Sequence, residues 1–203
     1  MAISVVHPDT GTATRILDVA EQFVQVRGFN GFSYADISAE LGITKAALHY
    51  HFAGKADLGR ALIVRYASRF AEALADVDAA AGGASARLAG YADLYRQVLH
   101  DQRMCLCGML AAEYQTLPQP MQDAVLAFFD QNEHWLEGVL EEGREAGILQ
   151  FGGTARATAR LIIGSLEGAM LIARPYGDEA RFQAAADSLL AGLIRPGAVT
   201  TVA

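Results

Sequence analysis

Two short helical segments separated by a glycine constrain this chain most. The first begins at Ser33 and has Asp36 three positions later, a variant of the capping box that starts a helix. Gly42 follows it, and glycine ends helices readily because it adopts the left-handed conformation without steric cost. The second helix, over residues 44–51, begins with a threonine that can cap free backbone N–H groups. Two short helices joined in this way form a helix-turn-helix, whose second helix enters the major groove of DNA.

The second helix combines a small apolar anchor with an unusual outer face. Leu48 and Phe52 are four residues apart, so they share one side and can bury it in a small core. The remaining surface carries a cation, a small residue and three ring side chains: Lys45, Ala46, His49, Tyr50 and His51. Such groups can contact phosphates and base edges. We therefore predict that this face meets DNA, with Thr44 at its start.

The segment from Ala13 to Leu58 resembles the DNA-binding head of the TetR/AcrR family of bacterial transcriptional regulators. The matching residues are Ile16-Leu17-Asp18-Val19-Ala20, Phe23, Arg27-Gly28-Phe29, Phe32-Ser33-Tyr34-Ala35-Asp36-Ile37-Ser38, Leu41-Gly42-Ile43-Thr44-Lys45, Leu48-His49-Tyr50-His51-Phe52 and Lys55-Ala56-Asp57-Leu58. This chain departs from the family pattern, which usually has an aromatic residue at His49 and often Gly or Pro at Ala46. Both departures affect which bases are read.

Composition and charge agree with a helical regulator. Ala and Gly are abundant and there are only five prolines, which favours an all-α chain. Residues 1–70 carry a net charge of +1 and residues 71–203 a net charge of −8, so an acidic body would repel DNA and orient the head toward it. No apolar run is long enough to span a bilayer and residues 1–14 lack the pattern of a signal peptide, so we expect a cytoplasmic protein without membrane contact.

We expect three regions: a helix-turn-helix DNA-binding domain over 1–54, a connecting helix over 55–80, and a ligand-binding and dimerisation domain over 81–203. In the head, residues 1–11 are expected to be a flexible arm, with Thr12 or Thr14 capping a first helix that ends near Arg27. The body is expected to contain five helices, over 86–99, 107–115, 119–146, 155–173 and 178–193. Breaks are expected at Thr116-Leu117-Pro118, from Gly143 to Gly153 and at Pro175-Tyr176-Gly177.

Polar and charged residues outside the second helix of the pair have different expected roles. Ser33, Tyr34 and Lys55 are expected to hold phosphates, Lys55 together with the backbone N–H groups that begin the connecting helix. Arg65 and Arg69 lie on one face of that helix, where solvated surface charge is favoured over a reach to DNA. A row of acidic residues, Glu133, Glu137 and Glu141, is favoured as a solvated face rather than a metal site.

A second set of side chains predicts a small-molecule pocket in the body. The stretch over 103–114 is rich in Met and Cys, which adapt to irregular shapes. Nine residues are expected to line a lipophilic cavity: Tyr91, Tyr95, Cys107, Met109, Glu113, Tyr114, Phe128, Trp135 and Met170. Among them Glu113 is the expected polar anchor. For any single one of them, plain core packing is an equally good explanation, and the family resemblance implies the pocket.

No catalytic or cofactor motif is found. Cys105 and Cys107 form a C-x-C pair without the further ligands that a structural zinc needs, so two buried reduced thiols are favoured over a redox sensor or weak chelation with His100. We expect no metal, no cofactor and no enzyme activity. The resemblance implies a homodimer formed through the last two helices, where Gly164 and Gly168 allow close approach.

The function expected from these features is a ligand-responsive transcriptional regulator, a repressor released from a pseudo-palindromic double-stranded DNA operator by a small lipophilic effector. The alternative is a helical small-molecule carrier or sensor whose head binds a protein partner. A steep loss of DNA affinity with salt would separate the two, because it measures counterions released from phosphates.

Overall fold

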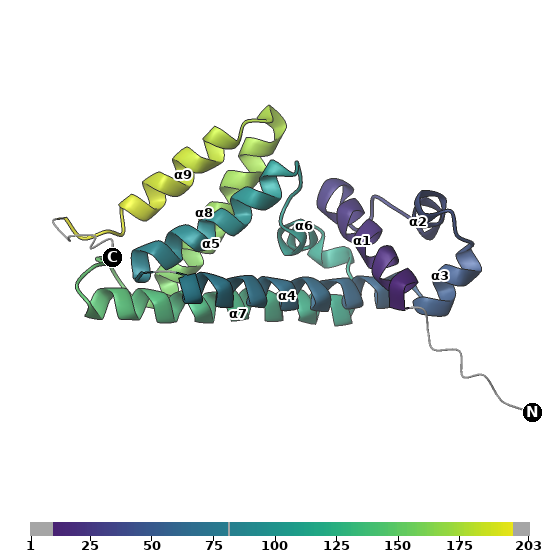
Figure 1. Ribbon diagram of the computed structural model, residues 1–203, viewed down its shortest axis with the longest axis horizontal. Coiled ribbons are helices and arrows are strands. Elements are labelled where there is room, and N and C mark those ends of the chain that lie inside the picture. Colours follow the sequence, from purple (N-terminus) through teal and green to yellow (C-terminus); the bar gives the residue numbers. More distant parts are fainter. Residues whose placement is uncertain (1–9, 81, 197–203) are drawn as a thin grey trace, which may run out of the picture.

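The structure is a computed structural model and describes residues 10–80 and 82–196 of the 203-residue chain. Within these residues the fold is all-helical, as predicted (Figure 1). The α-helices are α1 (Thr10–Arg27), α2 (Tyr34–Leu41), α3 (Lys45–His51), α4 (Lys55–Ala80), α5 (Ala84–His100), α6 (Leu106–Ala112), α7 (Gln119–Glu145), α8 (Ala155–Ala173) and α9 (Glu179–Ala191). Two single 3₁₀ turns are η1 (Tyr114–Thr116) and η2 (Arg174–Tyr176). None of the described helices is both long and apolar enough to cross a bilayer.

Helix α4 connects the two parts of the molecule. Figure 1 shows α1, α2 and α3 gathered at the N-terminal end of α4, and α7 running along its length. Helix α5 packs on α4 and α7, while α8 and α9 form a pair that rises from α7. The short helix α6 lies between the head and the body, where it contacts α1, α4 and α7. A shift of α4 or α6 in the body would therefore change the position of α1 in the head.

The head has a compact core of its own. Ile16, Ala20 and Val24 lie along one side of α1 and are fully buried, as the 3.6-residue spacing requires. They are joined by Leu48 of α3 and by Leu58, which belongs to the first turn of α4. The first turn of the connecting rod α4 thus contributes to the core of the head, and α4 packs against α1 there.

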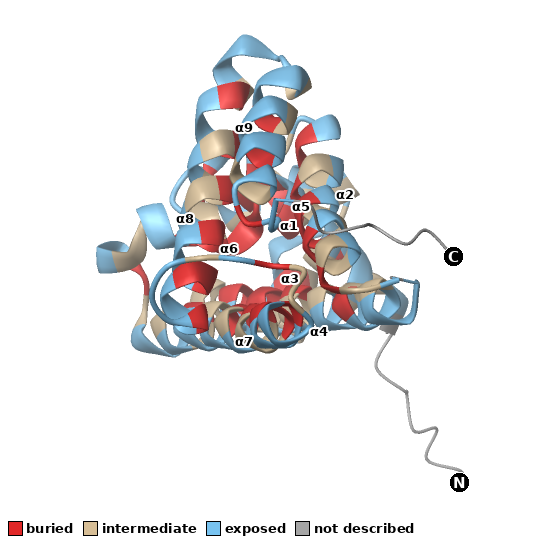
Figure 2. Ribbon diagram, turned by 90° about the vertical axis from the view of Figure 1, so that its left-hand side faces the viewer, coloured by how far each residue is buried: buried red, intermediate tan, exposed pale blue. Residues whose placement is uncertain are grey.

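The body core is mainly aromatic near α4 and aliphatic toward α8. Tyr91, Tyr95 and Phe128 are almost completely buried, and Phe70 makes edge-to-face contacts with all three. Figure 2 shows buried residues on the inward sides of the helices and exposed residues on the outside of α8 and α9. On α8, however, Leu161, Leu171 and Ile172 are large apolar residues that remain exposed.

Several predicted boundaries need correction. Helix α1 already includes Thr10, so Thr12 and Thr14 lie inside the helix and are not its cap; the rest of the expected N-terminal arm lies outside the described residues. Helix α7 spans Gln119–Glu145, close to the predicted 119–146, but the break expected from Gly143 begins only after Glu145, because Gly143 is a packing position within the helix. A side chain there would collide with Leu149 and Ala84.

The expected solvated acidic face of α7 is also partly wrong. Glu133 is half-buried and forms ion pairs with Arg160 at 3.0 Å and with Arg156 at 3.7 Å, both on α8. These pairs link α7 to α8, the two helices with the most extensive mutual packing. No group of acidic, histidine or cysteine side chains in the described ranges is arranged to hold a metal ion.

Candidate DNA-binding site and its links to the body

Local capping positions the two short helices. The carboxylate of Asp36 accepts hydrogen bonds from the backbone N–H and the hydroxyl of Ser33, at 2.7 and 2.6 Å, and these bonds lower the pKa of Asp36. Gly42 adopts the left-handed conformation with φ of 65°, and the N–H of Ile43 then bonds back to the carbonyl of Ser38 at 3.1 Å. The hydroxyl of Thr44 accepts from the N–H of Ala47 at 3.1 Å, which caps α3 as predicted.

Helix α3 buries one side and exposes the other. Leu48 is fully buried and Phe52 packs against the same hydrophobic core, so this side faces the interior of the head. Lys45, Ala46 and Tyr50 are exposed, Tyr50 to 70%. Neither the ammonium of Lys45 nor the hydroxyl of Tyr50 has a hydrogen-bond partner within residues 10–80 and 82–196. An exposed cation and phenol without intramolecular partners are available for an external ligand.

The two histidines of α3 are more constrained. His49 is exposed, but its Nδ1 lies 3.0 Å from the carbonyl of Ala53 and its ring packs on Tyr34 with centroids 4.9 Å apart. Its Nε2 edge is the part left for an external contact. His51 is half-buried and meets the ring of Tyr50 edge to face. Both rings therefore hold the outer face in a fixed arrangement.

Two of the expected phosphate ligands have intramolecular roles. The hydroxyl of Tyr34 donates to the carbonyl of Phe52 at 3.1 Å, and burial together with the nearby Asp57 raises its pKa to about 12. The ammonium of Lys55 donates to the carbonyls of Phe29 and Phe32 and lies over both of their rings. Partial burial lowers the pKa of Lys55. In this arrangement the ammonium faces into the head, which departs from the expectation that it points toward a phosphate.

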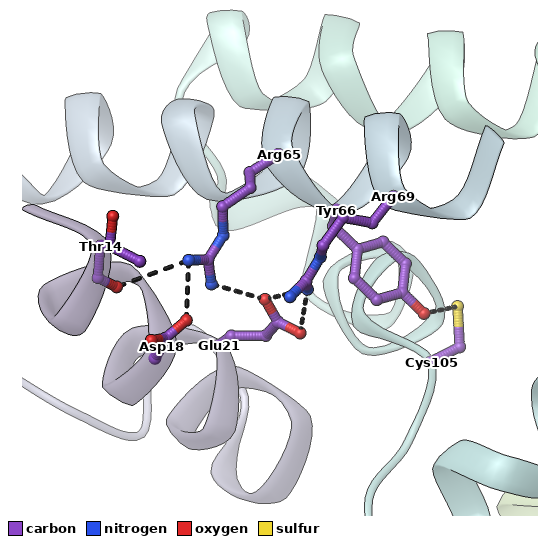
Figure 3. A network of polar contacts seen from close by, with 7 residues as sticks. All are labelled: Thr14, Asp18, Glu21, Arg65, Tyr66, Arg69 and Cys105. Atoms are coloured by element: carbon purple, nitrogen blue, oxygen red, sulfur yellow. Dashed lines mark hydrogen bonds and ion pairs between the residues drawn. The ribbon is translucent and has the colours of Figure 1, made fainter. Parts of the chain in front are cut away.

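An ion-pair network joins α4 to α1 (Figure 3). Arg65 binds Asp18 at 2.8 Å and Glu21 at 2.9 Å, and Arg69 reaches both oxygens of Glu21 at 2.5 Å. The Glu21 carboxylate is mostly buried, so these charge-assisted bonds are stronger than a surface pair. The expectation that Arg65 and Arg69 are solvated surface charges, or reach DNA, is therefore corrected: they fix the first helix of the head to the rod.

Glu113 forms a second link between head and body. Its carboxylate accepts from the backbone N–H of Phe29 at 2.5 Å and of Asn30 at 3.2 Å, just beyond the end of α1. Gly28, with φ of 82°, leaves room for this carboxylate, because a side chain there would touch it. Thr116 adds a bond to the side chain of Asn30 at 2.8 Å. The structure thus places Glu113 at the joint with the head, whereas the sequence predicted it as the polar anchor of a pocket.

Most of the other predicted pocket residues do meet inside the body. Five of them are buried: Tyr91, Tyr95, Cys107, Phe128 and Met170. The hydroxyl of Tyr91 forms hydrogen bonds with the hydroxyl of Tyr95 and with the amide oxygen of Asn132, each at 3.1 Å. Trp135 stacks on Tyr91 at 5.7 Å but sends its N–H outward to Asp78. Met109 and Tyr114 are half-buried nearer the head. The interior side chains fill this region by packing on one another.

The sequence reasoning missed the buried carboxylate of the body, Glu167 on α8. Its Oε1 is buried and has no hydrogen-bond partner in the described chain, and burial raises its pKa to about 7. It lies against Cys105 and against Gly108 of α6, where any side chain at position 108 would collide with it. Its only sequence signal is that it is the single charged residue in the apolar stretch over 161–173.

Cys105 and Cys107 are both free and buried, as favoured from the sequence. Burial is the main cause that raises the pKa of each thiol, and the nearby Glu167 adds to it. The hydroxyl of Tyr66 donates to the sulfur of Cys105 at 3.8 Å. His100 is exposed and pairs with Glu179 at 2.5 Å, so it does not join a cysteine site. Thiols in this setting are weak nucleophiles.

These features define the class of protein: a helix-turn-helix DNA-binding protein with a separate helical body. Residues 16–62 match the family described as bacterial regulatory proteins, tetR family, and residues 84–189 match the tetracyclin repressor-like C-terminal domain. The chain belongs to the TetR family of transcriptional regulators, which bind DNA and are not enzymes.

Solved structures of other bacterial proteins share this fold. A TetR-family regulator from Agrobacterium tumefaciens is 34% identical, with a TM-score of 0.88 over 92% of this chain and 99% of that one. A TetR regulator from Legionella pneumophila is 31% identical, with a TM-score of 0.82 over 94% and 100%. The reduced form of NemR from E. coli shares the fold at 24% identity, with a TM-score of 0.79 over 93% and 100%. A comparison with curated proteins gave no significant match.

Proposed function

We propose that this TetR-family regulator is a repressor that binds a pseudo-palindromic operator as a homodimer and leaves it when a small lipophilic effector binds in the body. The observation that carries the assignment of the reading face is the exposed side of α3. The ammonium of Lys45 and the hydroxyl of Tyr50 have no hydrogen-bond partner in the described parts of the chain, and both lie on a helix capped by Thr44 and anchored by Leu48. Ala46, beside them, is small enough to contact a thymine methyl group.

The dimer is proposed to form through α8 and α9. On α8 the exposed side carries Leu161, Leu171 and Ile172, exposed to 57%, 59% and 63%, and between them the small residues Gly164 and Gly168. These positions follow one another at helical spacing, so they form one apolar stripe. Glycines in the stripe would let two helices approach closely. A two-fold axis through this stripe would present two copies of α3 to one side of a DNA duplex.

The effector is proposed to bind by opening the aromatic interior of the body. Tyr91, Tyr95 and Phe128 supply apolar and hydroxyl surface there, and the unpaired oxygen of Glu167 supplies a polar contact that the closed form leaves unused. An effector with one hydrogen-bond donor would satisfy that oxygen. Burying an unpaired carboxylate oxygen is unfavourable, so a ligand that pairs with it gains affinity.

Two structural links, through α6 and through α4, would connect effector binding in the body to the position of the head. Helix α6 touches Glu167 near its start, and Glu113 at its end holds the backbone after α1. Helix α4 lines the aromatic interior through Phe70 and carries the arginines that hold α1. If the effector prefers a body shape in which α4 or α6 is displaced, it favours heads that are wrongly spaced for successive major grooves. The free-energy change in operator binding can be no larger than the difference between the effector's binding free energies for the two shapes.

The test has two parts. Affinity for a duplex recovered from the native genome is measured at several salt concentrations; we expect log K to fall linearly with log salt, with a slope set by the number of phosphates contacted. A reporter placed behind the same duplex is then measured with and without the regulator. Higher expression without the regulator supports a repressor, whereas lower expression would reject that role while leaving DNA binding intact.

A further inference from the structure

A cleft of about 280 Å³ lies where three elements meet at the junction of head and body. Its walls come from α1, from α4 and from the end of α5 with the turn that follows it. Gln25 belongs to α1, Phe70 to α4, and Arg103 to the turn. The cleft is separate from the aromatic interior, since the side chains of Tyr66 and Phe70 lie between the two. A molecule in the cleft would touch both the head and the body.

The most informative group in the cleft is the side chain of Gln25. The residue is only 2% exposed, and its Oε1 is buried without a hydrogen-bond partner within the described residues. Its backbone carbonyl accepts from the N–H of Met104 at 3.2 Å, so α1 and the turn hold it in place. Buried amide oxygens are nearly always paired in folded proteins. A ligand that donates a hydrogen bond to this oxygen would satisfy it.

The charges around the cleft favour an anionic ligand. The carboxylate of Glu21 is already neutralised by Arg65 and Arg69. The guanidinium of Arg103 is half-buried and forms no ion pair or hydrogen bond in the described ranges. Asp101, the other charged residue of the lining, is exposed at the rim, where water screens it. The uncompensated charge inside the cleft is therefore positive, and guanidinium groups bind carboxylates through paired hydrogen bonds.

The remaining walls are apolar and suit a flat molecule. Phe70 offers a ring, and Leu94 and Val98 stand on successive turns of the same side of α5. A volume of this size is at the small end of the range for ligand sites, which fits a single-ring compound rather than a large lipid. Apolar walls with a few polar groups at defined positions are typical of small-molecule sites.

We propose that this cleft binds a small aromatic carboxylic acid that carries one hydrogen-bond donor. Its carboxylate pairs with Arg103, its ring lies between Phe70 and the side of α5, and its donor bonds to Oε1 of Gln25. The carboxylate also competes with Glu21 for Arg69, which would loosen the clamp between α1 and α4. Binding itself is independent of the repressor mechanism; only the consequence for operator affinity rests on the proposed function.

The experiment measures direct binding of 4-hydroxybenzoate to the full chain by calorimetry, beside benzoate, 4-hydroxybenzyl alcohol and tyramine. We expect saturable binding of 4-hydroxybenzoate with a Kd of about 10 µM to 1 mM, the range open to a ligand of ten heavy atoms. Benzoate lacks the donor and 4-hydroxybenzyl alcohol lacks the charge, so each should bind several-fold more weakly. Stronger binding of tyramine, a cation, would overturn the proposal, as would no saturable binding of any of the four.

Two variants locate the site. Arg103→Gln should weaken 4-hydroxybenzoate about tenfold or more, whereas Arg60→Gln, an exposed arginine of α4 outside the cleft, should not. Gln25→Met keeps the length of the side chain but removes the acceptor, so 4-hydroxybenzoate and benzoate should bind it equally; Gln22→Met on the exposed side of α1 is its control. If the affinity for 4-hydroxybenzoate is unchanged in both cleft variants, the proposal is overturned. Binding that follows them without changing operator affinity retains the site and rejects only its coupling to DNA.

Discussion

Polar side chains have opposite environments on the outer face of α3 and in the interior of the body. On α3, Lys45 and Tyr50 are exposed, and their polar groups have no hydrogen-bond partner in the described ranges. In the body, the hydroxyl of Tyr91 pairs with the hydroxyl of Tyr95 and donates to the amide oxygen of Asn132, and one oxygen of Glu167 remains unpaired. Unpaired groups on a surface are solvated at little cost, whereas an unpaired group inside is destabilising.

This difference indicates where each region obtains its specificity. The reading face is complete without its ligand, since caps and a small core fix α3 and leave its polar groups outside. The body contains an internal polar group that its own packing does not satisfy. The two regions are joined by Glu113 and by the arginines of α4, so a change around the second region can alter the position of the first.

The largest expected effect comes from removing the polar side chains on the outer face of α3. The double variant Lys45→Ala with Tyr50→Ala should weaken operator binding by about 10³-fold or more, because a dimer loses two contacts in each head and each contact is worth at least about 1 kcal/mol. Gel shifts at one salt concentration measure this. The dimer and the melting temperature should be unchanged, since neither side chain packs in the core. Tyr176→Ala, another exposed tyrosine, is the control in the body.

The exposed apolar stripe of α8 should also be functional, because it is expected to hold two copies of the chain together. Ile172→Glu places a charge in the proposed interface and should give monomers in sedimentation experiments. Operator affinity should then fall about hundredfold, because two linked heads bind together more tightly than one. Leu126→Glu changes an exposed apolar residue of α7 and should leave the dimer intact. A wild-type chain that sediments as a monomer would contradict the proposed interface.

Glu167 should make the body less stable as pH rises. Its pKa is near 7 in the folded chain and about 4.5 when unfolded, so the folded state holds the extra proton between these values. Stability from this group is therefore greatest at low pH and is lost as pH rises through 7, by about 3 kcal/mol in total. Glu167→Gln should remove this loss, so it should be more stable than wild type at pH 8 and nearly equal at pH 4.5.

Urea unfolding at the two pH values provides the measurement. Glu141→Gln, an exposed acid on α7, is the matched control and should follow the wild type. If the stability gap between Glu167→Gln and wild type is the same at both pH values, Glu167 is not a buried protonated acid.

The smallest expected effect concerns the joint between the two regions. Glu113→Gln can accept from only one of the N–H groups of Phe29 and Asn30, so about 1–3 kcal/mol of local stability should be lost. Hydrogen exchange at these two amides should accelerate, while exchange in α7 should not. Glu145→Gln at the exposed end of α7 controls for loss of charge. Unchanged exchange at Phe29 and Asn30 would show that the joint does not depend on this carboxylate.

The sequence predicted well what depends on near neighbours. The caps at Ser33 and Thr44 and the turn at Gly42 are encoded within a few residues, and the rod over 55–80 follows from one uninterrupted helical pattern. The all-α fold and the helix order of the body could be read for the same reason. The assignment of individual side chains to DNA or to a pocket stays a prediction.

What the sequence could not show depends on residues far apart in the chain. Arg65 finds Glu21 44 positions away, and Glu113 finds Phe29 84 positions away. Nothing in the spacing around Lys55 indicates that its ammonium turns inward to the carbonyls of Phe29 and Phe32. Glu167 could not be recognised as buried, because its environment is made by α6 packing on α8.

The central claim, that the outer face of α3 reads DNA as one of a symmetric pair, is tested most directly by selecting bound sequences from a random duplex library. The account predicts a pseudo-palindrome with two half-sites, and a change of preferred bases at matching positions of both half-sites in His49→Ala. His134→Ala, an exposed histidine of α7, should select the wild-type sequence. A selected pool without two-fold symmetry, or base preferences that do not respond to changes in α3, would contradict the claim.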